Sequence, residues 1–449
     1  MPRVAIVTLG CPKNAVDSEG LGGLLTSGGH DVVEDPETAD VVVVNTCGFI
    51  DPARRETVDE VLELADLKET HLRGLVLTGC LVARSAPDLA EALPEVDALV
   101  DFAAYPRVAE IVERVAAGDL EERVFGEPGE RFDPAWWDAT IAASPRLRFG
   151  RAPWAYLKIA EGCDRGCTFC AIPLMRGKFR SRTLDVIERE ARQLAASGVT
   201  ELSLVSQDSV MWGRDIGDER LVDVLDRLEL VDGIRRVRLM YLHPQGVSEE
   251  LIDRILGSDQ VVNYFDLSLQ HVSPAVLKAM GRWGGRQRFE KIIDRIRSND
   301  PFAGVRSTFI LGFPGEDDYQ ARDVDAFVAE NDLDWIGVFG YSREEGTRSH
   351  DLSDQVPEAV VRQRVEMVAG TAELAMSRRA ESLVGVTAQV LVDRLDLDDR
   401  RWVGRSQREA PEVDGEIRFS SDHPVKVGDY VRVSITESNG ADLIGKAEP

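Results

Sequence analysis

No stretch of this sequence reaches the roughly 18 consecutive apolar residues that a membrane-spanning helix needs. The start, Met-Pro-Arg-Val-Ala-Ile-Val, also lacks the charged head, long apolar stretch and small-residue cleavage site of a secretory signal peptide. We therefore expect a cytoplasmic protein without a membrane partner. Cysteines stay reduced in that compartment, so metal binding or redox chemistry explains them better than disulfides do.

Positive charge is in short supply, because 53 Lys and Arg residues stand against 79 Asp and Glu, a net charge of −26 at pH 7. Proteins that bind nucleic acids mainly through phosphate contacts carry a basic face. Direct nucleic-acid binding is therefore not expected as the primary role. Two explanations of the acidity remain open: solubility or a compositional bias of the source, and electrostatic attraction to a basic protein partner.

Cysteine is rare as well, with six in 449 residues, and half of them lie in one short segment. Cys163, Cys167 and Cys170 have the spacing C-x3-C-x2-C, with no nearby fourth ligand. Residues 154–160 before them are typical of a strand that a Glu-Gly pair ends, which places the thiols on a loop. Three thiolates suit a sulfur-preferring metal, and a [4Fe-4S] cluster would keep one iron open for a small molecule. A structural zinc, which needs a fourth ligand, and a chance grouping are the alternatives.

This motif resembles the signature of the radical S-adenosylmethionine (SAM) superfamily. The resemblance implies that Cys163, Cys167 and Cys170 hold a [4Fe-4S] cluster whose open iron binds the amino and carboxylate groups of SAM. It further implies that an electron from this cluster cleaves SAM to a 5′-deoxyadenosyl radical, which abstracts a hydrogen atom from an unreactive carbon.

Each of the other three cysteines, Cys11, Cys47 and Cys80, closely follows a short apolar run that predicts a buried strand. Helical patterns alternate with these runs, which is typical of a parallel α/β sheet. Since the loops after parallel strands share one edge, where such sheets bind ligands, we expect the three thiols to converge on a second cluster with one open iron. The alternative is three unrelated cysteines that pack as small hydrophobic residues. The predicted strands are 4–9, 41–45, 75–78 and 98–101.

This second set resembles the methylthiotransferases, a radical-SAM family with an additional N-terminal cluster. The resemblance implies that Cys11, Cys47 and Cys80 bind the first [4Fe-4S] cluster, which carries or delivers the sulfur of the methylthio group. It also implies two SAM molecules per turnover, one that methylates sulfur and one that generates the radical. The matching segments are 9–14 (Leu-Gly-Cys-Pro-Lys-Asn), 45–50 (Asn-Thr-Cys-Gly-Phe-Ile) and 78–81 (Thr-Gly-Cys-Leu).

The middle of the chain alternates strand-like runs with helical patterns, which predicts a partial, TIM-like (β/α)6 barrel. The superfamily resemblance implies the same fold. Chemistry in such barrels gathers at the C-terminal ends of the strands. The six strand-like runs are 154–160, 201–205, 237–242, 265–269, 305–311 and 335–341.

Polar residues and glycines at two of these strand ends are candidate SAM contacts, because glycine allows close backbone approach and polar side chains can hydrogen-bond the ligand. Arginines that follow the cysteine loop, Arg176, Arg180 and Arg182, are further candidates to pair with a carboxylate. Simple turns, helix caps and structural arginines are the alternatives. No catalytic side chain is assigned beyond the cluster ligands. The candidate SAM contacts are Ser206, Gln207, Asp208, Gly312, Gly315, Glu316 and Arg182.

The C-terminal region contains five short strand-like runs and is predicted to form a small antiparallel β-barrel of the OB-like kind. It resembles the TRAM domain of methylthiotransferases, which holds RNA in tRNA-modifying members. Residues 382–449 contain 13 Asp and Glu and 9 Lys and Arg, a net charge of −4, which disfavours phosphate binding. The runs are 387–392, 402–405, 416–419, 430–435 and 443–447.

Four segments are therefore expected along the chain. They are a methylthiotransferase N-terminal domain at 2–118, a linker at 119–148, the radical SAM core at 149–381 and the TRAM domain at 382–449.

Shorter stretches indicate the substrate. They resemble the RimO type of methylthiotransferase, which modifies a ribosomal protein, more than the MiaB type, which modifies tRNA adenosine. The resemblance implies methylthiolation of the β-carbon of one aspartate in small-subunit ribosomal protein twelve, with an electron donor and a sulfur donor that the sequence does not identify. A tRNA methylthiotransferase and a non-catalytic iron–sulfur electron carrier or scaffold remain the alternatives. The stretches are 205–208 (Val-Ser-Gln-Asp), 269–274 (Leu-Gln-His-Val-Ser-Pro), and 341–342 (Tyr-Ser) with 344–347 (Glu-Glu-Gly-Thr), leading to 354–357 (Asp-Gln-Val-Pro).

Overall fold

A parallel sheet forms the N-terminal domain of the computed structural model, which describes residues 1–126 and 146–449. Its strands are β1 (Arg3–Thr8), β2 (Asp31–Val33), β3 (Val41–Thr46), β4 (Gly74–Gly79), β5 (Ala98–Val100) and β6 (Val124–Phe125). They pair in parallel in the order β2-β1-β3-β4-β5-β6. Every residue of β3 and β4 is buried, as expected for central strands of a sheet that is covered on both faces.

Four helices cover this sheet: α1 (Pro12–Ser27), α2 (Asp51–Asp66), α3 (Cys80–Ala92) and α4 (Val108–Ala117). Side chains of α1 and α4 pack on one face, and those of α2 and α3 pack on the other. The predicted parallel α/β domain is therefore confirmed. The sheet continues past residue 118, where the first domain was expected to end, because β6 pairs with β5.

The central domain is built on six parallel strands. They are β7 (Trp154–Lys158), β10 (Glu201–Val205), β11 (Arg236–Leu239), β12 (Tyr264–Gln270), β13 (Gly304–Leu311) and β14 (Trp335–Gly340). They pair as β7-β10-β11 and β12-β13-β14, and isolated parallel bridges, Val237 with Val261 and Leu242 with Leu267, join the two halves. The result is the open, partial barrel that the sequence predicts.

Helices cover the outside of this barrel and share one apolar core with the strands. The large helices are α7 (Leu184–Ala196), α8 (Leu221–Glu229), α9 (Glu249–Leu256), α11 (Arg286–Asn299), α12 (Asp318–Glu330) and α13 (Glu358–Glu381). Shorter elements near the strand ends are β8 (Ala160–Glu161), α6 (Ile172–Arg176), β9 (Arg180–Ser181) and α10 (Pro274–Ala279).

Five strands close the C-terminal domain into a barrel in the order β15-β16-β17-β19-β18, with β18 paired to β15. They are β15 (Thr387–Leu395), β16 (Trp402–Arg405), β17 (Ile417–Ser420), β18 (Tyr430–Asn439) and β19 (Asp442–Ala447). The predicted small barrel is confirmed. Its pairings are antiparallel except for β17 with β19, which is parallel. A ring with an odd number of strands cannot alternate direction all the way round, so one parallel pair is unavoidable.

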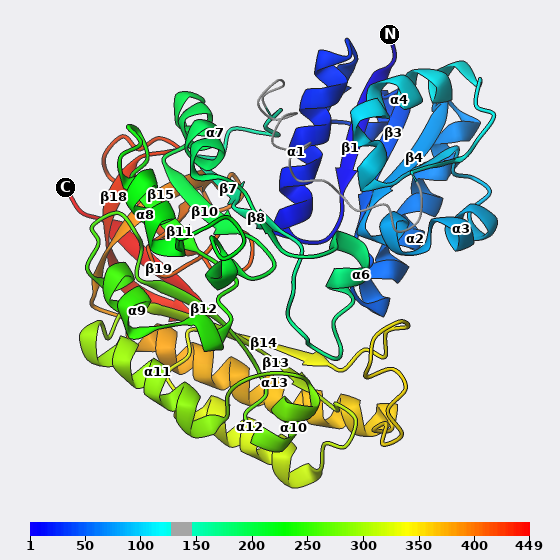
Figure 1. The fold of residues 1–449 in the computed structure, drawn as a ribbon. Coiled ribbons are helices and arrows are strands. Elements are labelled where there is room, and N and C mark those ends of the chain that lie inside the picture. The colour runs from blue at the N-terminus through cyan, green and yellow to red at the C-terminus, as the bar shows by residue number, and fades with distance from the viewer. Residues whose placement is uncertain (127–145) are drawn as a thin grey trace.

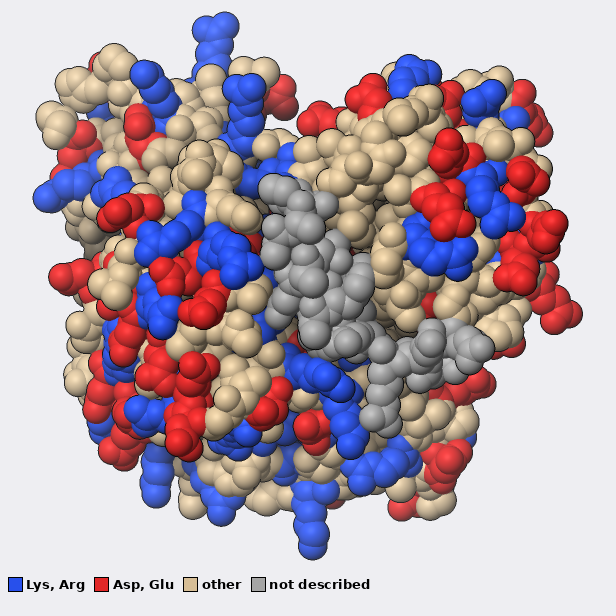
Figure 2. Space-filling view, turned by 45° about the horizontal axis from the view of Figure 1, so that its top comes forward, with Lys and Arg blue, Asp and Glu red and all other residues tan. Residues whose placement is uncertain are grey.

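The N-terminal sheet and the C-terminal barrel lie on opposite sides of the central domain, as Figure 1 shows. Most of the predicted linker at 119–148 lies outside the described residues, and the exact domain boundaries stay a prediction. Within the described residues, each helix is too short or too polar to traverse a lipid bilayer. Acidic and basic side chains are interspersed over much of the face displayed in Figure 2.

Candidate functional site

A cavity of about 440 Å³ lies where the carboxyl edge of the N-terminal sheet faces the mouth of the partial barrel. All six cysteines of the chain line it. Two groups of thiols that are separate in the sequence therefore share one space. This convergence, between two domains, makes the cavity the candidate active site.

The first three cysteines reach the cavity because β1, β3 and β4 are neighbours in the sheet. Cys11 is the cap residue of α1, Cys47 lies between β3 and α2, and Cys80 is the first residue of α3. Two glycines let the loops approach one another closely. A Cβ on Gly10 would lie 2.7 Å from Cys47 Cβ, and one on Gly48 would lie 2.7 Å from Leu81 Cα.

Two buried asparagines fix these loops to one another. Asn14 Nδ2 donates to the carbonyl oxygens of Leu9, at 2.8 Å, and Thr46, at 3.0 Å. Asn45 Nδ2 donates in turn to the carbonyl oxygen of Asn14 at 2.9 Å. Asn14 thus ties the segment after β1 to the end of β3, and Asn45 ties β3 back to α1, so the segments that carry Cys11 and Cys47 are held together.

The second group lies on the loop between β8 and α6, which the opposite side of the barrel holds in place. Thr168 donates its backbone N–H to Met280 O and its hydroxyl to Ala279 O, both at 2.9 Å. Arg282, from the same region, points its guanidinium at Cys167 Sγ, with 3.5 Å between Nη1 and the sulfur. The loop is therefore anchored at the strand ends where barrel chemistry is expected.

Burial controls the protonation of these thiols. It raises the pKa of Cys80 and of Cys163 to about 11 and that of Cys170 to about 12. Burial also acts to raise the pKa of Cys11, but the charges of Lys13 and Arg176 outweigh it and lower that pKa. A metal that binds the thiols must displace their protons, as cysteine-bound metals do.

No group of three or more His, Cys, Asp or Glu side chains within residues 1–126 and 146–449 is arranged around a single ion. An iron–sulfur cluster does not require such a group, because its cysteines bind separate iron atoms at the corners of a cube. The two sets of three thiols in one cavity fit that donor chemistry.

Arg176 connects the two groups of cysteines across the domain interface. It projects from α6 of the central domain, and its Nε lies 3.2 Å from Cys80 Sγ. Its other nitrogens donate to Asn14 Oδ1 at 2.7 Å, Asp17 Oδ2 at 2.6 Å and Glu161 Oε2 at 3.1 Å. The guanidinium is buried, and four of its five N–H groups are bonded to these protein groups.

Lys158 completes this buried network. Its ammonium group donates to Asp17 and also to Glu161, the latter at 2.7 Å. Glu161 Oε1 accepts from Gln207 Nε2 at 2.6 Å, which carries the network to the end of β10. The pKa of Glu161 is about 2, because Arg176 and Lys158 outweigh the opposing effect of burial.

Glu344 forms a second connection between the domains, on the segment that follows β14. Its carboxylate pairs with Arg54, and with Arg84 at 2.7 Å, and it accepts from the backbone N–H of Asp51 at 3.1 Å. Arg84 also donates to Gly48 O, next to Cys47, at 3.0 Å. The side chain of Glu344 is only 2% exposed. Sequence reasoning missed this role, and no local pattern signals it.

Two of the candidate SAM contacts, Gln207 and Asp208, line the cavity. Asp208 pairs with Arg165 at 2.5 Å, and burial raises the pKa of Asp208 despite that partner. Gln207 Oε1 and Asp208 Oδ1 are buried without a hydrogen-bond partner in the described part of the chain, as are Arg165 Nη2 and Arg282 Nε. Unsatisfied polar atoms around a cavity are what a polar ligand would pair with, so the residues present fit a molecule such as SAM.

The other five candidates do not line the cavity in the part of the chain that the structure describes. Ser206 bonds to the hydroxyl of Ser209, and Arg182 pairs with Glu190. Glu316 accepts from Gly312 N at 2.9 Å and pairs with Arg364 at 3.0 Å. Gly315 donates its N–H to Asp354 O. Contact of these residues with SAM stays a prediction.

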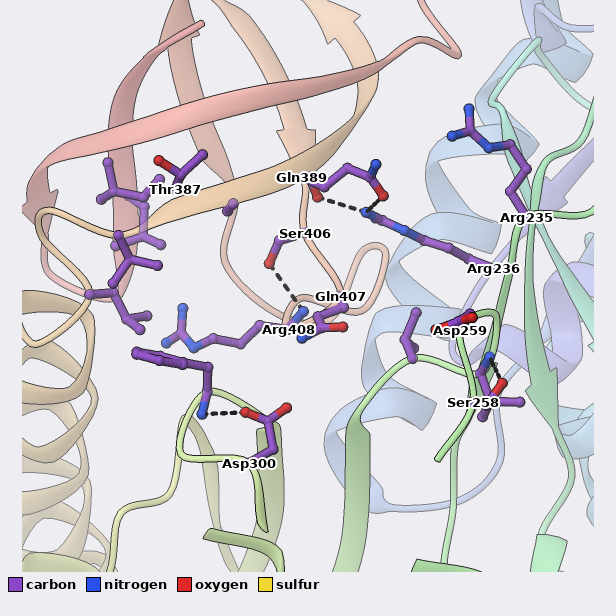
Figure 3. A pocket seen from close by; sticks show the side chains of 18 residues that line it. Arg235, Arg236, Ser258, Asp259, Asp300, Thr387, Gln389, Ser406, Gln407 and Arg408 are labelled. Carbon is purple, nitrogen blue, oxygen red and sulfur yellow. Dashed lines mark hydrogen bonds between the residues drawn. The ribbon is translucent and has the colours of Figure 1, made fainter. Parts of the chain in front are cut away.

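A second cavity, of about 360 Å³, lies between the C-terminal barrel and the central domain. Figure 3 shows Arg236 of the central domain directed at Gln389 of the barrel across this space, with Asp300 at its far side. The described residues that line it include no cysteine. It is therefore a gap in a domain interface rather than a place for sulfur-bound metal.

Three family models match the chain. They are the uncharacterized protein family UPF0004 over residues 3–101, the Radical SAM superfamily over 157–328 and the TRAM domain over 384–447. The cysteine loops thus fall in the first two matches.

Curated relatives match over almost the full length. Proteins from Kineococcus radiotolerans, Trichlorobacter lovleyi and Acetivibrio thermocellus are 42%, 39% and 37% identical to this chain. The matches cover 99% of the chain in each case, and 97%, 98% and 98% of the respective relatives. All three are named ribosomal protein uS12 methylthiotransferase RimO.

Among solved structures, the chain is similar to TsrM from Kitasatospora setae, a radical S-adenosylmethionine methyltransferase bound to cobalamin and a [4Fe-4S] cluster. The TM-score is 0.58 at 17% sequence identity, and the match covers 77% of this chain and 73% of that chain. At this identity the similarity concerns the fold alone.

Proposed function

Since the chain belongs to the RimO family of ribosomal protein uS12 methylthiotransferases, we propose that it methylthiolates the β-carbon of one aspartate in uS12 with two [4Fe-4S] clusters. It is a radical SAM methylthiotransferase, and its superfamily implies SAM and a [4Fe-4S] cluster as cofactors. The second cluster, the aspartate and a cytoplasmic location are parts of the proposal. A reductant and a sulfur donor, both unidentified, complete the set of partners.

The observation that carries the proposal is the shared cavity of the six cysteines. Cys163, Cys167 and Cys170 would hold the SAM-binding cluster, and Cys11, Cys47 and Cys80 would hold the sulfur-handling one. When bound, these groups supply a radical that removes a hydrogen atom and a sulfur that replaces it. Such chemistry suits a β-carbon, whose C–H bond is too weakly acidic for an ordinary side-chain base.

The protein's own contribution is to position the two sets of thiols and the ligand between them. The Arg176 network fixes the first set of thiols relative to the second, and Glu344 closes the domains on the other side of Cys47. Gln207 and Asp208 offer unpaired acceptors, and Arg165 and Arg282 offer unpaired donors, to a polar ligand between the thiols. These groups orient the reactants that the cofactors transform.

A comparison of a deletion strain with its parent tests the proposal. We expect mass spectrometry to find that uS12 loses its methylthio group in the deletion strain, while methylthio-adenosine in tRNA is unchanged. The opposite pattern would assign the chain to tRNA modification. A separate assay incubates the reduced, cluster-loaded protein with SAM, and absence of 5′-deoxyadenosine would favour an electron carrier or scaffold.

A further inference from the structure

Lys13 places a positive charge inside the candidate active site. It follows Cys11 by two positions, its side chain lines the cavity, and the residue is 8% exposed. Its Nζ lies 3.4 Å from the centre of the Tyr241 ring, which also lines the cavity and belongs to the central domain. A cation from one domain thus rests on an aromatic face from the other, in the cavity that both sets of cysteines line.

Two of the three arginines around the thiols, Arg165 and Arg176, have carboxylate partners. Arg165 pairs with Asp208, Arg176 pairs with Asp17 and Glu161, and Arg282 donates to Ser268 O and Cys167 Sγ. In residues 1–126 and 146–449, neither Lys13 nor Arg282 forms an ion pair with a carboxylate, and the groups that act on Lys13 are Tyr241, Cys11 and Arg176. A buried ammonium without a carboxylate partner is stabilised only in part by an aromatic ring and the neighbouring Cys11 thiol. Lys13 is therefore available to bind an anion.

The backbone is distorted to hold this arrangement. Tyr241 follows β11, and Gln270 is the last residue of β12. Their φ values are 60° and 70°, in the left-handed region that residues other than glycine rarely adopt. Both residues line the cavity. Tyr241 N donates to Asp266 Oδ2 at 2.9 Å, which holds the strained residue in place. Strain of this kind concentrates at ligand sites.

We propose that Lys13, supported by Tyr241, binds the side-chain carboxylate of the substrate aspartate and so selects aspartate over asparagine. This inference rests on the proposed function. The β-carbon to be modified is one bond from the carboxylate, so placing that carbon between the two sets of thiols brings the negative charge into the cavity. Among the described residues that line the cavity, Lys13 is the one lysine. It lies two positions from Cys11, which belongs to the sulfur-handling set. Arg165 and Arg282 are adjacent to the other set.

The test measures binding of two peptides to the cluster-loaded enzyme. One peptide spans the modified aspartate of uS12, and the other carries asparagine in its place. We expect the wild-type enzyme to bind the aspartate peptide about tenfold more tightly or better, since a desolvated charge pair is lost with asparagine. Lys13→Gln should bind both peptides equally, and Lys13→Arg should recover most of the preference. Iron and sulfide content is measured for every variant, so that a damaged cluster is recognised.

Lys278→Gln is the matched control, because Lys278 is exposed on α10 and the substitution removes the same charge. It should leave the preference for aspartate unchanged. Equal weakening of both peptides by Lys13→Gln, or equal binding of both by the wild-type enzyme, would overturn the inference while leaving methylthio transfer intact. If Lys13→Gln loses its clusters, Lys13→Met takes its place and should likewise bind both peptides equally. Failure of the wild-type enzyme to modify the aspartate peptide at all would instead overturn the proposed function.

Discussion

Arg176 Nε lies 3.2 Å from Cys80 Sγ, although the two residues are 96 positions apart and belong to different domains. The same guanidinium stacks over Phe102 at 4.4 Å and pairs with Asp17 and Glu161. Arg176 lies on a helix that follows the second set of cysteines, and it contacts a sulfur of the first set. The two sets are held as one unit rather than as two independent loops.

Replacement of Arg176 by Met should destabilise this unit. The change leaves Asp17 and Glu161 with only Lys158 to balance two buried negative charges, and breaking such a pair costs about 3–5 kcal/mol. We expect a lower urea midpoint for the metal-free protein and less iron bound per chain after reconstitution. Arg176→Lys should lie between Met and wild type, because it keeps the charge and loses the forked geometry.

Arg107→Met provides the control, because Arg107 pairs with Glu110 on the surface of the same protein, with more than half of each side chain exposed. Its urea midpoint should not differ measurably from wild type. Wild-type stability and iron content in Arg176→Met would show that the network is dispensable.

The convergence of Cys11, Cys47 and Cys80 was predictable from sequence because it follows a general rule. Loops after adjacent parallel strands meet at one edge, and the apolar runs before Cys11, Cys47 and Cys80 identify those strands. The roles of Arg176 and Glu344 were not predictable, since the partners of Arg176 lie up to 162 positions away and those of Glu344 up to 293. A local sequence window carries no signal for such long-range ion pairs.

The candidate SAM contacts illustrate the same limit. Asp208 and Glu316 each follow a strand of the barrel, and the sequence gives no reason to separate them. In the structure, Asp208 lines the cavity, whereas Glu316 does not and instead contacts Arg364 and Gly312 N. Arg364, which pairs with Glu316, comes from helix α13, 48 positions further along the chain.

Replacement of Cys11, Cys47 and Cys80 together by alanine should remove one proposed cluster and leave the other. The triple variant should bind about four irons per chain instead of about eight, because one set of thiolates remains. It should still form 5′-deoxyadenosine from SAM and should lose methylthio transfer to uS12. Iron analysis, chromatography of the nucleoside and mass spectrometry of uS12 measure these outcomes. Sulfur insertion at the wild-type rate would contradict the role assigned to the first set.

Glu344→Gln should loosen the closure of the N-terminal domain on the barrel. The carboxylate balances Arg54 and Arg84, and an amide leaves both cations poorly paired. We expect faster hydrogen–deuterium exchange in residues 342–347 and around Cys47, with a higher KM for uS12. Glu345→Gln is the neighbouring control and should exchange like wild type. Unchanged protection at Cys47 would mean that Glu344 does not hold the interface.

Glu201 should make the docking of the C-terminal barrel sensitive to acid. Burial alone would raise the pKa of this fully buried carboxyl, but Arg405 of β16 and Arg238 of β11 lower it from 4.5 to about 2. Because the folded-state pKa is depressed, the stabilisation is complete above pH 4.5 and disappears as the pH falls toward 2. At about 1.4 kcal/mol per pKa unit, it amounts to about 3 kcal/mol at neutral pH.

Urea unfolding of Glu201→Gln as a function of pH tests this value. The variant should be less stable than wild type at pH 7, and the two should converge as the pH approaches 2. Glu358→Gln, which changes an exposed carboxyl on α13, should follow wild type throughout. A difference between Glu201→Gln and wild type that does not shrink with acid would assign the effect to packing instead of charge.

Asp208→Asn and Glu316→Gln, compared side by side, should distinguish a SAM contact from a structural carboxylate. Asp208 faces the cavity with one oxygen unpaired, so its amide variant should raise the KM for SAM in 5′-deoxyadenosine formation about tenfold, with normal iron content. Glu316 is buried against Arg364, so Glu316→Gln should lower the urea midpoint and leave the KM for SAM near wild type. The reverse pattern would place SAM at the end of β13 rather than β10, and would return Glu316 to the set of direct contacts.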